Sequence, residues 1–474
     1  EPEASSRETF AELALPTDIR RIESEGFGEN TADAVEKYFA FFKILPGESE
    51  IPLHLFGHPL TLRIFCQTAN PDREKEITVE HFPASLWPLL ESYLDHSCER
   101  ISQLENLAYS YDKQEVRAAI HRLGLAIWDS ESRIVCEAAF RSTVSDNDRG
   151  WGCSIVNLLA QEGIIFRNPG EQPGQFDLTP AYDALGGFIA ARALLNSDQA
   201  ERPFAWLRHS KFSFGALMAW LRQLFGDDSR DKAYELFVGE KSHELSTDIV
   251  RALVALTPLH VPGRQFWKEL PASLHAAALR LTTEIDPQHI DQETVDALGR
   301  LLQDHSEREL RLFGRLRPIR AVKDHPLNAE FLDRTLTSMH VSDRDISWTE
   351  WVRGTREDRL ADVLALEQKW IARTERSAAD VLVATWLKWL LSSTDRELRD
   401  VTTRALHWYG RGGPAELFGE TLSSLSINDP YVPERMLAAS YGTAMACYAN
   451  SSASGESVDT LNEFARSIFS AMFA

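Results

Sequence analysis

The spacing of hydrophobic and polar positions changes twice within residues 158–195. A helical pattern ends at Gly163, and two short apolar runs follow, Ile164–Phe166 and Phe176–Leu178, separated by a polar turn rich in Pro and Gly. Two such runs around a turn predict an antiparallel hairpin. From Pro180 onwards the apolar positions return to helical spacing. A helix, a hairpin and a second helix in this order indicate a winged-helix unit.

Upstream of this unit the pattern predicts helices. They are expected at Ala32–Ile44, from Pro59 onwards, at Leu86–Ala108 and at Lys113–Trp128. Pro59 suits the first turn of a helix because proline has no backbone N–H and the first turn needs none. The polar residues 70–80 are predicted to form a loop.

Downstream of residue 196 the pattern is almost entirely helical. Helices are predicted at Ala205–Phe225, Asp231–Val238, Ser246–Leu256, Ala272–Glu284, Gln292–Gln303 and beyond. Two later stretches, Thr394–Tyr409 and Asn428–Tyr441, resemble one another, and each begins near an Asp that can cap a helix, Asp395 or Asp429. This recurrence favours a solenoid of stacked helix pairs, with irregular helical packing as the alternative for residues 200–390.

These patterns predict a mainly α protein with three parts. A helical subdomain (residues 1–108) is followed by a winged-helix domain (109–197) and then by an α-solenoid of HEAT-like or TPR-like helical repeats (198–474). A chain of 474 residues exceeds the size at which one hydrophobic core keeps growing, which agrees with several domains.

The composition of the chain supplies ample material for a core. It is 43% hydrophobic and contains 12 Trp. Two Trp-rich segments, Ile346–Val352 and Thr385–Leu390, have helical spacing and are predicted to fill the solenoid core. The alternative is an exposed Trp face, which marks a partner site.

The formal net charge of −21 opposes a general affinity for nucleic acid or anionic membranes. The 5 Cys have no CxxC spacing, which predicts reduced thiols without structural zinc in a cytoplasmic protein. No apolar run is long enough to span a bilayer, and no signal peptide opens the chain. The chain begins with Glu1 rather than Met, so we expect it to be part of a longer protein.

Catalytic motifs are missing from the sequence. It contains no phosphate-binding loop of the G-x-x-x-x-G-K-[ST] type, no G-x-S-x-G and no H-E-x-x-H. Lone histidines such as His58, His209 and His407 are interpreted as surface or packed residues. We therefore expect no complete active site in this chain, and no nucleotide or metal bound by it alone.

Several segments, taken in order, resemble a known family. They are YFAFF, GHPLTLRIFC (Gly57–Cys66), LLAQEGIIF (Leu158–Phe166) and AYDALGGFIAARALL (Ala181–Leu195). This order resembles the helical and winged-helix subdomains of STAND NTPases of the NACHT type, and most of all the bacterial antiviral STAND proteins called Avs. The later segments Val341–Val352 and Asp429–Gly442 resemble the C-terminal helical part of the same proteins.

The resemblance implies a function in antiphage defence. In this family an effector precedes an ATPase module that uses ATP and Mg, and a helical sensor binds a phage protein, such as the portal or the terminase large subunit. Binding drives formation of a homo-oligomer and activates the effector. Gly57 and Pro59 match the family's GxP motif, whose proline packs against the nucleotide, and Tyr182 stands where relatives have a nucleotide-sensing histidine. A neutral phenol donates only one hydrogen bond, so Tyr182 has the alternative role of packing at a helix start.

Two other functions compete with this one. A winged-helix transcriptional regulator needs a basic recognition surface, but Val116–Trp128 carries only Arg117, His121 and Arg122, and the hairpin turn at residues 168–175 has no Lys or Arg. A HEAT-type scaffold without any connection to a nucleotide is the other alternative. The acidic charge favours a protein ligand over DNA and predicts no direct binding to nucleic acid or membranes.

Overall fold

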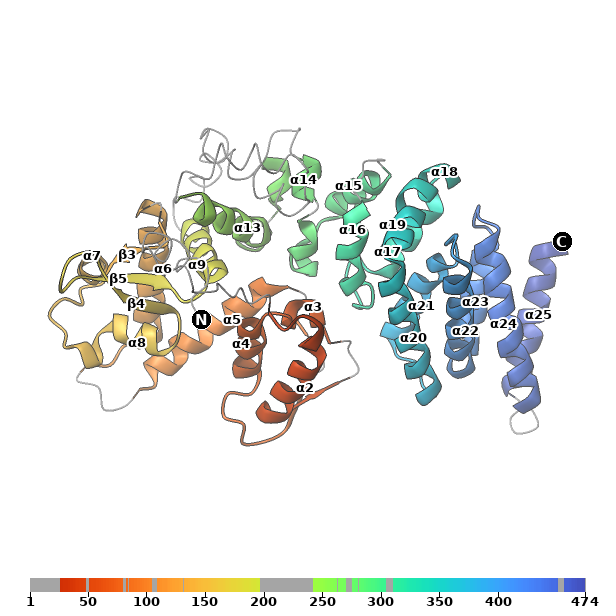
Figure 1. The fold of residues 1–474 in the computed structure, drawn as a ribbon, viewed down its shortest axis with the longest axis horizontal. Coiled ribbons are helices and arrows are strands. Elements are labelled where there is room, and N and C mark those ends of the chain that lie inside the picture. Colours follow the sequence, from red (N-terminus) through yellow and green to blue (C-terminus); the bar gives the residue numbers. More distant parts are fainter. Residues whose placement is uncertain are drawn as a thin grey trace, which may run out of the picture. The chain divides into compact units, whose positions relative to one another are not determined.

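The chain is mainly helical in a computed structural model (Figure 1). The structure describes residues 26–47, 51–79, 82–83, 85–104, 109–130, 132–196, 242–261, 263–269, 275–279, 281–303, 310–450 and 456–473. The helices predicted at Ala205–Phe225 and Asp231–Val238, and His209, lie outside these residues.

The chain divides into two compact units. Unit 1 comprises Glu1–Gly47 and Pro52–Asp291, and unit 2 comprises Glu48–Ile51 and Gln292–Ala474. The predicted domain boundaries after residues 108 and 197 fall at or within segments outside the described residues, and they stay predictions.

The helices predicted upstream of residue 196 and at Ser246–Leu256 are present, with shifts at their ends. The longer helices of unit 1 are α2 (Thr31–Phe42), α4 (Pro59–Ala69), α5 (Leu86–Ser102), α6 (Lys113–Ser130), α9 (Asp183–Leu195) and α13 (Ser242–His260). Shorter helical elements are η1 (Gly28–Asn30), α3 (Leu53–Phe56), α7 (Glu137–Thr143), η2 (Trp151–Cys153), α8 (Ile155–Gln161), η3 (Phe266–Glu269), α14 (His275–Leu279), η5 (Thr282–Glu284) and η6 (Pro287–His289). The single helix predicted at Ala272–Glu284 was wrong in extent, because its last residues form the 3-10 turn η5, and α14 is the α-helical part among the described residues of this stretch.

The segment predicted as a loop at residues 70–80 contains a strand. Strand β2 (Ile77–Val79) pairs in parallel with β1 (Ile44–Pro46), and Ile44 lies opposite Ile77. Asn70 supports this ladder, since its side-chain amide donates to the carbonyl oxygens of Phe42 and Lys75. A pair of three-residue strands is too short to leave a clear periodicity in the sequence.

The predicted hairpin is confirmed and gains a third strand. Strands β4 (Ile165–Pro169) and β5 (Phe176–Pro180) pair antiparallel, with Arg167 opposite Leu178. The short strand β3 (Val135–Cys136) joins the other edge of β5, so the sheet order is β3-β5-β4. A strand of two residues gives no signal in the sequence.

Helix α9 lies in the core of unit 1. It packs against α6 and α13, and its apolar residues from Leu185 to Leu195 are almost all buried. The approach of α6 is close, since a Cβ on Gly124 would lie 2.4 Å from the carbonyl oxygen of Ile189. Arg192, the one basic residue of α9, makes a bidentate pair with Glu91 of α5. Such a fork geometry binds α9 to α5 with directional hydrogen bonds.

Unit 2 is built from helices that pack on their neighbours along the chain. Its helical elements are α15 (Gln292–Leu302), α16 (Leu310–Leu316), η7 (Arg317–Ile319), α17 (Ala329–Ser338), α18 (Val341–Arg344), the π-helical turn η8 (Asp345–Thr349), α19 (Glu350–Gly354), α20 (Arg356–Ala372), α21 (Ala378–Leu390), α22 (Arg396–Gly412), α23 (Pro414–Ser424), α24 (Tyr431–Asn450) and α25 (Glu456–Phe473). Helices α20, α22 and α24 pack in one row, and α21, α23 and α25 in another (Figure 1).

The Trp-rich segments fill the core of unit 2, as predicted. Trp348, Trp386 and Trp389 are fully buried. The Trp348 ring lies edge-on to Trp386 with centroids 5.4 Å apart, and it contacts Trp351 at 5.0 Å. The Trp348 indole N–H donates to the Trp389 carbonyl oxygen at 2.9 Å, and the Trp389 indole N–H donates to Asp333 at 2.7 Å. These contacts exclude the alternative of an exposed Trp face in these segments.

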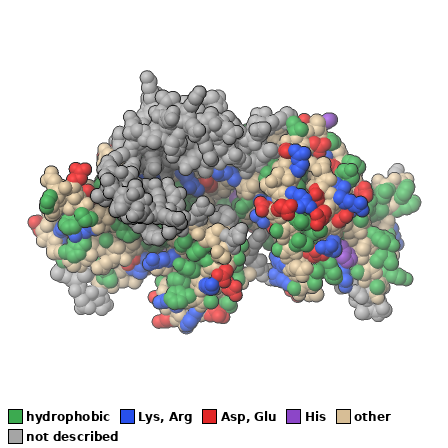
Figure 2. All heavy atoms as spheres, viewed as in Figure 1, with side chains coloured by type: hydrophobic (Ala, Val, Ile, Leu, Met, Phe, Trp, Pro, Cys, Tyr) green, Lys and Arg blue, Asp and Glu red, His purple; other side chains and the backbone are tan. Residues whose placement is uncertain are grey.

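The surface carries charges of both signs. On the face drawn in Figure 2, Lys and Arg side chains are interspersed with Asp and Glu over the described part of unit 2. Among the helices that the structure describes, none combines the length and the apolar character required to cross a bilayer.

Candidate functional site

The Gly57-His58-Pro59 element forms the start of helix α4. Pro59 is the first helical residue, as predicted, and His58 is the N-cap with an extended backbone. The His58 Nδ1 atom accepts a hydrogen bond from the Leu60 N–H at 3.3 Å. One of the N–H groups that every helix start leaves unsatisfied is therefore satisfied by the imidazole.

The backbone before η1 contacts the Gly57-His58-Pro59 element. The Phe27 N–H donates to the Gly57 carbonyl oxygen at 2.9 Å. Gly26 has a φ of +84°, and a Cβ there would lie 2.5 Å from the same oxygen. Position 26 therefore requires glycine for both its conformation and its close approach to Gly57.

Tyr182 lies against this element. It is the N-cap of α9 and only 9% exposed. Its ring centroid is 5.6 Å from that of His58, and its hydroxyl is 3.4 Å from the Thr61 hydroxyl. Thr61 and Tyr182 are 121 positions apart in the sequence. The structure thus brings the Gly57–Pro59 element and Tyr182, the residues predicted to face a nucleotide, into one junction.

An ion pair holds the start of α9 beside the junction. Asp183, the residue after Tyr182, pairs with Arg133 at 3.3 Å, and both side chains are largely buried. The polar groups here are an imidazole, two hydroxyls and this ion pair. Hydrogen bonding to a ligand is within their chemistry, but no strong nucleophile is among them. In the part of the chain that the structure describes, no cluster of His, Cys, Asp and Glu is arranged to hold a metal ion.

The buried thiols near this region are chemically inert. Burial raises the pKa of Cys66, on α4, to about 12 and that of Cys98, on α5, to about 11. Both thiols are therefore protonated at neutral pH and poor nucleophiles. All five cysteines are free in the structure.

Sequence reasoning missed several members of the junction. His58 is a packed residue, which is one of the two interpretations that the sequence offers, but its role as the cap of α4 was not predicted. Thr61, Arg133 and Gly26 gave no signal of their own. The position of His58 directly before a helix-start proline was the available clue, because Nδ1 of a histidine can act as an N-cap acceptor there.

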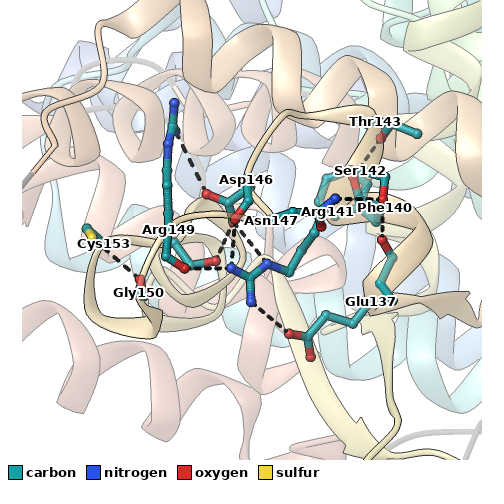
Figure 3. A network of polar contacts seen from close by, with 12 residues as sticks. Glu137, Phe140, Arg141, Ser142, Thr143, Asp146, Asn147, Arg149, Gly150 and Cys153 are labelled. Atoms are coloured by element: carbon teal, nitrogen blue, oxygen red, sulfur yellow. Dashed lines mark hydrogen bonds and ion pairs between the residues drawn. The ribbon is translucent and has the colours of Figure 1, made fainter.

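A buried polar network fixes the loop between α7 and α8 (Figure 3). Asp146 is fully buried and accepts hydrogen bonds from the hydroxyls of Tyr111 and Ser154. Arg141 donates to the carbonyl oxygens of Asp146 and Arg149, both at 2.7 Å. Burial raises the pKa of Tyr111 to about 12, so its hydroxyl remains a donor at neutral pH. The loop is therefore held in one conformation.

The network extends to the sheet through arginine and aromatic contacts. Glu137, at the start of α7, is buried and accepts a hydrogen bond from Arg167 of β4. The Arg167 guanidinium lies 3.3 Å from the centroid of the Phe176 ring and 4.2 Å from that of Trp151. These contacts therefore connect helix α7 and the following loop to the hairpin.

The helix that directly precedes the hairpin is α8 and not the 116–128 helix considered for DNA recognition. Its sequence, IVNLLAQ, contains no Lys or Arg, and Ile155–Leu159 are all buried. A recognition helix must present basic and polar side chains to a groove. The geometry of α8 therefore offers no observation in favour of a DNA-binding regulator.

No known protein family, curated protein or solved structure matches this chain. Its function is therefore inferred from its own residues and their geometry.

Proposed function

We propose that this chain is the switch and sensor portion of an antiviral STAND NTPase of the Avs type. In this proposal the parent protein binds ATP and Mg, recognises a phage protein such as the portal or the terminase large subunit, and assembles into a homo-oligomer that activates an effector. The chain acts in the cytoplasm and hydrolyses nothing by itself, because it lacks a phosphate-binding loop.

One observation carries the proposal. The Gly57–Pro59 element and Tyr182 contact each other through His58, although they are far apart in the sequence. A nucleotide that touches both the GxP element and the winged-helix domain would link these two subdomains. Such a nucleotide would stabilise the contact between His58 and Tyr182. Loss of this contact would release the switch.

The order of elements around the hairpin supports the winged-helix part of the proposal. The sequence α6, β3, α7, α8, β4, β5 with sheet order β3-β5-β4 is typical of a winged helix. The rigid loop between α7 and α8 and the apolar α8 suit a domain that transmits movement between protein parts rather than one that reads DNA.

The helix rows of unit 2 support the sensor part. Helices that pack mainly on their near neighbours along the chain are typical of α-solenoids, which bind proteins over extended surfaces. Helix α24 carries an exposed stripe with helical spacing, Tyr441, Met445 and Tyr448, which are 69%, 52% and 71% exposed. Exposed aromatic stripes of this kind favour a protein ligand.

The experiment is a binding assay between the purified chain and purified phage portal and terminase large subunits. We expect a stable complex with one of them in size-exclusion chromatography. Tyr441→Glu combined with Tyr448→Glu should weaken that complex by at least about tenfold, because the substitutions place charge on the stripe. The matched control is Phe166→Glu, which alters an exposed aromatic residue on the hairpin of unit 1. Failure of every structural phage protein to bind would overturn the sensor role.

A further inference from the structure

Three arginines of unit 2 gather around one carboxylate. Arg317 starts the turn η7, Arg320 follows that turn, and Asp362 belongs to α20. The Nε and Nη2 atoms of Arg317 lie 3.3 and 2.9 Å from the two oxygens of Asp362, and Nη2 of Arg320 donates to Oδ1 at 3.1 Å. Arg359 lies about one helical turn before Asp362 on α20. The guanidinium groups of this cluster therefore outnumber the carboxylate that they share.

Arg359 is buried without an anionic partner. The residue is 5% exposed, and its Nε and Nη1 atoms are fully buried without a hydrogen bond to any described residue. Its guanidinium lies 5.0 Å from the centroid of the Trp351 ring, which attracts the charge but accepts no strong hydrogen bond. A buried guanidinium without acceptors is costly. An anion bound beside Arg359 would reduce this cost.

The surrounding charges leave Arg359 in a positive environment. Burial lowers its pKa to about 10, and the next largest cause is the charge of Arg317, ahead of the opposing effect of Asp362. Arg320 lowers the pKa further, and the exposed Asp358 opposes this change least. The Arg317 guanidinium is therefore close to that of Arg359. At neutral pH Arg359 stays charged, and the arginines of the cluster exceed its carboxylates.

The nitrogens that a ligand can reach belong to two different arginines. The Arg317 side chain is 35% exposed, and its Nη1 makes no hydrogen bond to a described residue, since Nε and Nη2 face Asp362. On Arg359 the nitrogen outside the fully buried pair is Nη2. Each arginine thus presents a single nitrogen instead of a complete fork. A planar carboxylate pairs best with one fork, whereas the oxygens of a tetrahedral phosphate can accept from separate donors.

We propose that Arg317 and Arg359 bind a phosphate group, with Nη1 of Arg317 and Nη2 of Arg359 donating to different oxygens. Asp362, which also accepts from Arg320, holds the Arg317 guanidinium in position. The phosphate can be inorganic or belong to the monoester of a small molecule. The site lies within unit 2 and is independent of the proposed antiviral function.

The test is isothermal titration calorimetry at constant ionic strength with inorganic phosphate, glycerol 3-phosphate and acetate. We expect at least one of the two phosphates to bind about tenfold or more tightly than acetate, because it keeps one more charge-assisted hydrogen bond. Tighter binding of glycerol 3-phosphate than of inorganic phosphate would identify a monoester as the ligand, and the reverse or equal affinity would identify inorganic phosphate. No binding of either phosphate at millimolar concentrations, or acetate binding as tightly as both, would overturn the proposal.

Variants connect the binding to the cluster. Arg359→Met removes the buried guanidinium but keeps an unbranched side chain beside Trp351, and affinity for phosphate should fall about tenfold. Arg317→Gln changes a partly exposed side chain and should weaken binding to a similar degree, so it tests the site even where Arg359→Met lowers stability.

The matched control is Arg353→Gln. Arg353 is an exposed arginine of α19, paired with Glu350 at 2.7 Å outside the cluster, and its loss should leave phosphate affinity unchanged. Circular dichroism of each variant shows that it is folded. Unchanged affinity in Arg317→Gln, or an equal loss of affinity in Arg353→Gln, would contradict the site.

Discussion

Among the histidines that the structure describes, three accept a hydrogen bond from the backbone N–H two residues ahead. Nδ1 of His58, His325 and His340 lies 3.3, 3.0 and 3.4 Å from the nitrogens of Leu60, Leu327 and Ser342. The three histidines share this local geometry but differ in their surroundings. His58 contacts Tyr182, His325 lines a cavity, and His340 is exposed. The tertiary neighbours, and not the local motif, therefore decide what each histidine can do.

The burial of His325 predicts a dependence of stability on pH. Burial lowers its pKa from 6.5 to about 4, so below pH 6.5 the unfolded chain takes up this proton more readily than the folded chain. The stabilising contribution is full above pH 6.5 and is lost as the pH falls towards 4, by about 3 kcal/mol over the window. We expect the difference in free energy of unfolding between the native chain and His325→Asn to shrink over this window, measured by urea unfolding at pH 7, 5.5 and 4.5. A constant difference would contradict the prediction.

Substitutions of Tyr182 separate the contribution of its ring from that of its hydroxyl group. Its hydroxyl contact with Thr61 is long, at 3.4 Å, whereas its ring is buried. Tyr182→Phe should therefore change the free energy of unfolding by less than about 1 kcal/mol. Tyr182→Ala should cost roughly 3–5 kcal/mol, because it leaves a cavity beside His58. Thermal unfolding followed by circular dichroism measures both, and equal losses in the two variants would show that the hydroxyl matters more than the ring.

At the scale of elements, α22 and α24 begin in a related way. Asp395 accepts from the Leu398 N–H at 2.7 Å, and Asp429 accepts from the Tyr431 N–H at 2.9 Å. Each carboxylate also pairs with an arginine from an earlier element, Arg356 or Arg344. The two predicted Asp caps are therefore confirmed, and each also connects its helix to another part of unit 2.

The two caps should differ in their contribution to stability. Arg344 is fully buried, and Asp429 is its one ion-pair partner among the described residues. Asp429→Ala therefore leaves a buried charge without a counterion and should cost roughly 3–5 kcal/mol. Asp395→Ala is the matched control. It removes the cap and one ion pair, but Arg356 keeps Glu357 and Glu397, so the loss should be about 1 kcal/mol. Urea unfolding of both variants measures the two losses in free energy of unfolding. A larger loss in Asp395→Ala than in Asp429→Ala would contradict the prediction.

At the scale of the whole molecule, unit 2 has its own core. Its buried side chains include Trp348, Trp370, Trp386 and Trp389, which contact residues of the same unit. Buried Lys388 also finds its partners there, with Asp333 at 2.8 Å and Glu420 at 2.9 Å. A unit whose apolar and charged groups are satisfied internally has what a domain needs to fold alone.

We therefore predict that residues Gln292–Ala474 fold when expressed separately. The fragment should show helical circular dichroism and one cooperative thermal transition, with tryptophan emission that shifts to longer wavelength on melting. Trp386→Ala should lower the free energy of unfolding by roughly 3–5 kcal/mol, because it empties the middle of the aromatic cluster. A gradual melt without a cooperative step would show that unit 2 depends on the rest of the chain.

The sequence by itself determined the mainly helical class, the hairpin at residues 165–180, the proline start of α4, the two Asp caps and the burial of the Trp-rich segments. These features depend on local chemistry and on a regular spacing of apolar residues, which a single sequence displays.

Only the tertiary structure decided the rest. The strands β2 and β3 are too short for a periodicity and exist because distant partners pair with them. The contact of His58 with Tyr182 and the Asp146 network join residues whose meeting depends on how the chain folds back on itself. Such contacts over long sequence separations leave no trace in the local pattern, and the candidate sites of this protein are made of them.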